Sequence, residues 1–96
     1  MIKATEARTN VINHEVEKYN QIKKIVDELL EAMSKSIEFH SKNGYESVDF
    51  MPYGNSRFPS DAAKITASGM FETILKDNGY EIIQHDWSQN ILKVRW

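Results

Sequence analysis

The sequence contains no cysteine, only two prolines and four glycines, and its net charge is only −2. Without cysteine there is no disulfide framework, no thiolate metal ligand and no thiol nucleophile. No stretch approaches the roughly 20 apolar residues that a membrane-spanning helix needs, and the first residues lack the apolar core of a signal peptide. The small net charge gives no general electrostatic reason to expect binding to nucleic acid or to anionic membranes. We therefore expect a cytoplasmic protein.

The length and the hydrophobic content indicate a single folding unit. A chain of 96 residues, 41% of them hydrophobic, can build one modest core. A chain of this size is near the lower limit of comfortable independent stability, so burial against a partner would help it. We expect one α+β domain over residues 1–96.

A long amphipathic segment from about Thr5 to His40 organises the chain. It contains no proline or glycine, and its apolar positions recur at alternating steps of four and three, which is typical of one face of a continuous helix. A lysine within this series argues against a strict two-stranded coiled coil throughout. The series consists of Ile12, Val16, Tyr19, Lys23, Val26, Leu30, Met33, Ile37 and His40.

Such a helix is too long for its own domain. About 35 helical residues span roughly 50 Å, whereas a compact domain of about 100 residues is only some 30–35 Å across. Either the helix bends between Asn10 and His14, where two asparagines weaken it, or its projecting apolar side chains pack against another copy. Both can hold, and we favour a homo-oligomer. Its expected interface consists of Val11, Ile12, Val16 and Tyr19.

The pattern of the remaining residues predicts short strands and one helix, separated by residues typical of turns. Ser60 is the expected N-cap of a second helix, and Asn78-Gly79 its end. The order α-β-α-β-β predicts an α+β fold with a small three-stranded, mostly antiparallel sheet and both helices on one of its faces. The expected elements after the long helix are a strand over 45–51, a helix over 61–77, and strands over 80–84 and 91–95 joined by a hairpin loop over 85–90.

The loop before the second helix is the candidate ligand site. Arg57 could bind an anion in bidentate fashion beside the free N–H groups of the helix start, and the rings of Tyr53 and Phe58 could stack on a planar base. In the alternative, the two rings fill the edge of the core, Arg57 pairs with a local carboxylate, and Asp61 repels an anion. The predicted site for a small anionic, nucleotide-like ligand comprises Tyr53, Asn55, Ser56, Arg57, Phe58 and Ser60.

Signals for catalysis are weak. The three histidines, His14, His40 and His85, show no metal-ligand spacing with one another. His85 and Asp86 are a candidate acid–base pair, but we expect them in a hairpin loop with no nucleophile beside them. No phosphate-binding loop, dinucleotide fingerprint or nucleophile-elbow motif is present. We expect a protein that is not an enzyme, with no cofactor and no metal.

Both ends of the chain resemble a group of small viral proteins. The chain begins MIKATEAR, and it ends with a helix, Gly79-Tyr80 and a hairpin that closes on Trp96. This resembles small uncharacterised bacteriophage and prophage proteins that begin M-I-x-A-x-E-A-R and end with G-Y and a hairpin closing on tryptophan. The resemblance leaves residues 45–59 uncovered and carries no functional residue across.

The resemblance implies a viral origin and a binding role. The protein would be a phage accessory protein that binds a host protein or a small anionic signal in the host cytoplasm, for example to block defence. The alternative is a virion or assembly component that uses the long helix as a packing surface. Stoichiometric amounts in purified particles would favour the second hypothesis.

Overall fold

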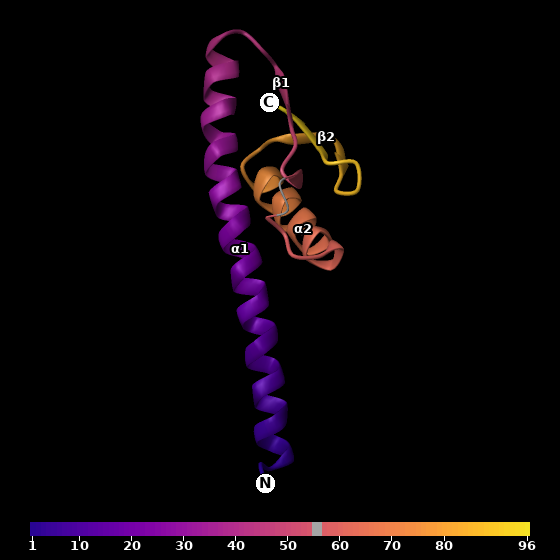
Figure 1. Ribbon diagram of the computed structural model, residues 1–96. Coiled ribbons are helices and arrows are strands. Elements are labelled where there is room, and N and C mark those ends of the chain that lie inside the picture. Colours follow the sequence, from indigo (N-terminus) through magenta and orange to yellow (C-terminus); the bar gives the residue numbers. More distant parts are fainter. Residues whose placement is uncertain (55–56) are drawn as a thin grey trace.

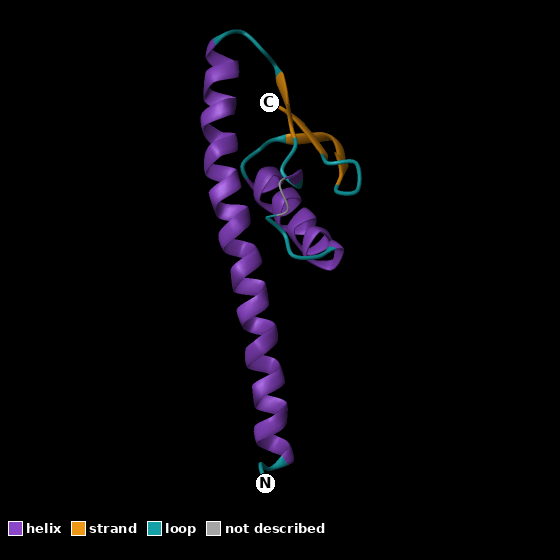
Figure 2. Ribbon diagram, viewed as in Figure 1, coloured by secondary structure: helices purple, strands orange, loops and turns teal. Residues whose placement is uncertain are grey.

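The computed structural model describes residues 1–54 and 57–96. A long, rod-like helix carries a second helix and a small sheet on its C-terminal half, and the N-terminus lies at the far end of the rod (Figures 1 and 2). The predicted α+β class and the predicted order of elements are confirmed. The elements are α1 (Ala4–Lys42), β1 (Ser47–Phe50), α2 (Asp61–Asp77), β2 (Glu81–Asp86) and β3 (Ile91–Arg95).

Helix α1 is continuous over 39 residues. The region between Asn10 and His14, where a bend was one of the two alternatives, does not interrupt the helix. Asparagine is less favourable than alanine in a helix by less than about 0.7 kcal/mol per residue, which is too little to interrupt a ladder that contains no proline or glycine. The helix ends in a Schellman motif, with Gly44 at a φ of 85° and the Tyr45 N–H donating to the His40 carbonyl at 3.0 Å.

Helix α2 has the boundaries that the sequence predicts, Asp61–Asp77. The hydroxyl oxygen of Ser60 accepts a hydrogen bond from the Ala63 N–H at 3.2 Å, which confirms the predicted N-cap. Gly79, at a φ of 86°, allows the chain to leave the helix by a left-handed turn, as Gly44 does after α1. Strong local signals at both ends explain why this helix is predictable.

The three strands form an antiparallel sheet in the order β1-β3-β2. Val48 lies opposite Val94, and Phe50 lies opposite Leu92. Directly opposed residues point to the same face, and these four side chains all belong to the core or pack against it. Helix α1 lies against β1, α2 lies against β2, and the two helices contact each other. Both helices therefore cover one sheet face, as predicted.

A β-bulge in strand β2 changes which side chains face the helices. Ile82 lies opposite Val94 and Gln84 lies opposite the preceding residue of β3, so Ile83 has no partner in the register. The extra residue shifts the alternation, and Ile82 and His85 lie on the same face although they are three residues apart. His85 is thus part of a strand and faces α2, whereas the sequence predicts it in a hairpin loop.

The core lies between the helices and the covered sheet face. Its largest fully buried side chains come from both helices and the sheet: Val26 of α1, Phe71 of α2, and Leu92 and Val94 of β3. Full burial of such a side chain contributes about 1.5–3 kcal/mol. These contacts hold the C-terminal half of α1 to the rest of the domain.

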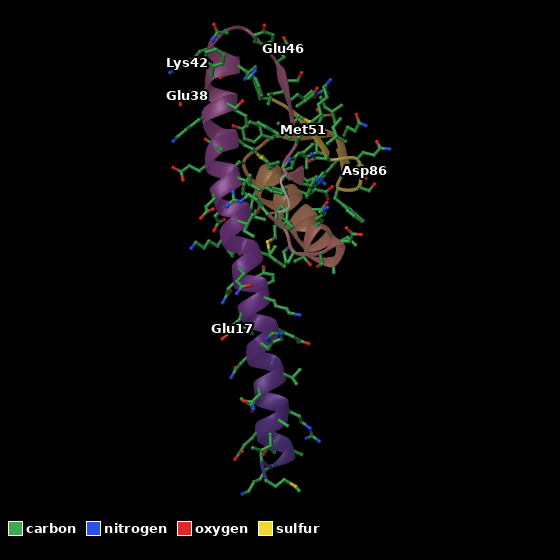
Figure 3. The ribbon with its side chains drawn as sticks, viewed as in Figure 1. Glu17, Glu38, Lys42, Glu46, Met51 and Asp86 are labelled. Carbon is green, nitrogen blue, oxygen red and sulfur yellow. The ribbon has the colours of Figure 1, made fainter. Side chains whose placement is uncertain are left out.

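The N-terminal half of α1 extends beyond this core. The protein measures 64 × 24 × 18 Å with a radius of gyration of 16.7 Å, compared with about 12–13 Å for a compact domain of this length. Val26 is the first buried residue of α1. Glu17 and Glu38 point away from α2 and the sheet (Figure 3), so the polar side of the helix faces solvent along its length.

The contrast between two residues of α2 tests this packing. Phe71 is fully buried and Ile65 is 55% exposed. We expect Phe71→Ala to lower the free energy of unfolding by about 3–5 kcal/mol through lost burial and a residual cavity, and Ile65→Ala to change it by less than about 1 kcal/mol. Urea unfolding followed by circular dichroism measures both values. Equal losses for the two variants would contradict the described core.

Candidate functional site

A groove of about 820 Å³ lies between α1 and the first half of α2. Ile22, Ile25 and Ala63 supply apolar lining, and polar side chains from both walls surround them. The volume is within the roughly 300–1,000 Å³ of typical ligand pockets. The lining residues are Glu15, Lys18, Tyr19, Gln21, Ile22 and Ile25 of α1, and Arg57, Pro59, Ser60, Ala62, Ala63 and Thr66 of the loop and α2.

Two of the predicted ligand residues line this groove. Arg57 forms an ion pair with Glu28 of α1, and both side chains are partly exposed. This is the local carboxylate pairing of the alternative hypothesis. An exposed pair of this kind contributes about 0–1 kcal/mol, so Arg57 can exchange partners at little cost. Ser60 also lines the groove, but its hydroxyl oxygen caps α2.

The two predicted stacking rings do not face the groove. Tyr53 is 4% exposed and Phe58 is 3% exposed, and their ring centroids are 5.9 Å apart within the core. Their predicted role in stacking on a planar ligand is wrong, because no ring face is open. The predicted residues Asn55 and Ser56 lie outside the residues that the structure describes.

The predicted interface residues share one exposed surface, which we call the apolar stripe. Val11 and Ile12 are each 59% exposed, and Val16 and Tyr19 are each 51% exposed. Tyr19 also lines the groove. The stripe on the projecting half of α1 therefore runs directly into the groove.

A second cluster, which sequence reasoning missed, surrounds His85. The His85 side chain is 3% exposed, and its Nδ1 lies 3.1 Å from Oε1 of Glu72 on α2. The Tyr53 hydroxyl forms a hydrogen bond with Nε2 on the other side of the ring. The Ser68 hydroxyl lies 3.3 Å from Nε2. Ser68 and Glu72 are four residues apart and so share a helix face, but only the bulge in β2 turns His85 toward them.

Burial keeps the phenol of Tyr53 protonated in this cluster. Burial raises the pKa of Tyr53 to about 12; a hydrogen bond with Ser68 lowers it, and the nearby negative charge of Glu72 raises it further. The phenol is therefore neutral at pH 7 and can act as the donor in its hydrogen bond with Nε2 of His85. Nδ1, on the other side of the ring, lies within hydrogen-bond distance of the Glu72 carboxylate.

Hydroxyl, imidazole and carboxylate occur here in the order found in catalytic triads, but the surroundings differ. Such triads need a place for substrate beside the nucleophile and donors for the developing oxyanion. None of the four clustered residues lines the groove, and Tyr53 and the His85 side chain are buried. The hydrogen bonds of this cluster pair the buried polar side chains where the β2–β3 hairpin contacts α2.

In place of the candidate acid–base pair with His85, Asp86 makes local contacts. Asp86 accepts hydrogen bonds from the N–H of Ser88 at 2.9 Å and from its hydroxyl at 2.6 Å. The Ser88 hydroxyl is the main reason that the pKa of Asp86 lies below its usual range. Asp86 thus shapes the hairpin turn, while His85 turns toward α2.

The described residues contain no group of three or more metal-ligating side chains. No described helix has the length and apolar content to cross a membrane. Comparisons with protein-family models, with curated proteins and with solved structures give no match. The groove and the stripe are therefore interpreted from their geometry and chemistry alone.

The raised pKa of Tyr53 predicts that the free energy of unfolding depends on pH in the alkaline range. The phenol ionises near its ordinary pKa of 10.0 in the unfolded chain but near 12 in the folded protein. The folded state therefore holds this proton more tightly. The stability that results is present below pH 10 and is lost as the pH rises toward 12. The fall should amount to about 2–3 kcal/mol, because each unit of pKa shift corresponds to about 1.4 kcal/mol.

Unfolding in urea from pH 9 to pH 12 measures this effect. We expect Tyr53→Phe to lack this component of the pH dependence. Tyr45→Phe, which alters a 60% exposed residue, should behave as the wild type does. Parallel pH profiles for the wild type and Tyr53→Phe would contradict the burial of the phenol.

Proposed function

We propose that the protein is a non-enzymatic binding protein whose working surface is the apolar stripe together with the adjoining groove. One observation carries the proposal: the four stripe residues are each at least half exposed on a projecting helix and lead into an apolar-lined groove. Contiguous exposed apolar surface of this kind marks interaction sites in soluble proteins. The buried position of the His85 cluster, away from the groove, supports a role without catalysis.

The stability of helices supports the same proposal. Most helical stability in proteins comes from tertiary packing of an apolar face. The projecting segment of α1 contains weak helix formers, among them Asn10, Val11, Ile12 and Asn13. Packing of its apolar face on a partner would stabilise this segment, and each buried aliphatic side chain would contribute about 1.5–3 kcal/mol.

The class of partner follows from the hypotheses that the sequence raised. A phage accessory protein would present this surface to a host protein, and a virion or assembly component would present it to other structural subunits. The geometry favours a protein partner in both cases, since the surface is long, apolar and helical. Presence of the protein at stoichiometric amounts in purified particles would favour the structural role.

A small anionic ligand is the second candidate. Lys18 and Arg57 bring two cationic side chains to the groove, and Arg57 would exchange its Glu28 partner for the ligand. The neighbouring Glu15 opposes an anion, and no aromatic pair from the Tyr53 loop is open to stack on a base. Calorimetric binding of a nucleotide that is lost in Arg57→Gln would favour this candidate.

Photo-cross-linking in the cells that make the protein tests the proposed surface. A photoreactive phenylalanine analogue at Val16 should give discrete cross-linked products, because the stripe contacts a protein. The same analogue at Lys35, whose side chain is 78% exposed on the opposite face, should give none. If neither position gives a cross-linked product, the proposal is contradicted. Products from Lys35 alone would also contradict it, because the interaction surface would then lie on the opposite face of α1.

A further inference from the structure

We infer that the groove is occupied by the free N-terminal segment of α1, residues 4–14, from a second copy of this chain. The inference rests on the proposed function and names the partner of that same surface. The two α1 helices would lie antiparallel, related by a twofold axis near Glu15. Each copy would then insert its free segment into the other copy's groove, so that both exposed surfaces are covered in one step.

Matching lengths along α1 support this arrangement. The groove-lining residues of α1 extend from Glu15 to Ile25, which is about 15 Å at about 1.5 Å per residue. The free segment, from Ala4 to His14, is also about 15 Å long by the same measure. Because both lengths start from the same point on one helix, a twofold axis at that point superimposes the segment of one copy on the groove of the other.

The chemistry of the two surfaces is complementary in this register. An axis at Glu15 sets the partner's Val11 opposite Tyr19, the partner's Arg8 opposite Ile22 and the partner's Thr5 opposite Ile25. Val11 of the stripe thus meets Tyr19, which belongs to both the stripe and the groove, and the aliphatic stem of Arg8 can cover Ile22 while its guanidinium stays in water.

The charges near the axis are compatible with contact. The two Glu15 side chains approach each other there, and Lys18 lies three residues along each helix, where its charge offsets their repulsion. The segment itself carries Glu6 and Arg8, so it brings no excess charge of one sign to the groove.

The exposed area of the chain exceeds that of a compact monomer. The chain exposes 6808 Å², whereas a compact monomer of the same mass exposes roughly 5,700 Å². The excess of about 1,100 Å² is close to the roughly 800 Å² per partner that a standard interface buries. The arrangement is also closed, because each surface is used once and none is left to propagate a filament.

Cross-linking through engineered cysteines tests the register, because the natural chain has none. Glu15→Cys lies near the axis, so a short thiol-reactive cross-linker should join two copies of this variant at micromolar concentration. The matched variant Lys35→Cys lies on the solvent face and should stay single. Light scattering of the unmodified chain should give the mass of two copies.

Charged substitutions in the apolar stripe provide a second test of the dimer. Val16→Glu with Tyr19→Glu should reduce the scattering mass to one copy and abolish the cross-link at position 15. Lys24→Glu with Lys35→Glu introduces two glutamates on the opposite face and should remain dimeric. Circular dichroism and urea unfolding of the C-terminal domain show that a monomeric variant is still folded.

A monomeric wild type, a dimer that cross-links through Lys35→Cys, or a dimer unaffected by the charged stripe would overturn the inference. A monomer that nevertheless gives cross-links to another protein from Val16 in cells would overturn the second copy as occupant and leave the proposed function standing. A monomer that gives no such cross-links would remove both.

Discussion

Because the backbone hydrogen bonds of α1 continue from Ala4 to Lys42, the helix is longer than the domain packed on it. The rest of the structure depends on this mismatch. The C-terminal half of α1 is held by buried contacts such as Val26 against α2 and the sheet, and the N-terminal half has no equivalent support. The apolar stripe and the groove both result from this mismatch. The stripe lies on the unsupported half of α1, and the groove lies where α1 begins to pack against α2.

Where local signals decide the structure, the sequence was sufficient. Ser60 and Gly79 determine the ends of α2, and alternating apolar residues determine the strands, so the order of elements and the single covered sheet face could be predicted. The exposed stripe on the first helix could be predicted as well, because the comparison of helix length with domain size uses only the sequence. Its occupancy by a partner stays a prediction.

Where tertiary context decides, the sequence was not sufficient. A single bulge at Ile83 reverses the facing of His85, and nothing local signals the insertion of one residue. The loop before α2 has the composition of a ligand site, but Tyr53 and Phe58 are used in the core, and Arg57 has a carboxylate within reach on α1. The residue types were compatible with both hypotheses, and only three-dimensional packing separates them.

Hydrogen exchange measured as a function of protein concentration tests the dependence of α1 on a partner most directly. We expect the amides of residues 7–14 to be protected at high concentration and to lose that protection on dilution, while those of residues 26–42 stay protected throughout. Protection of residues 7–14 that is independent of concentration would contradict the dependence on a partner, since the segment would then be stable alone. Rapid exchange of the same residues at every concentration would contradict it from the other side.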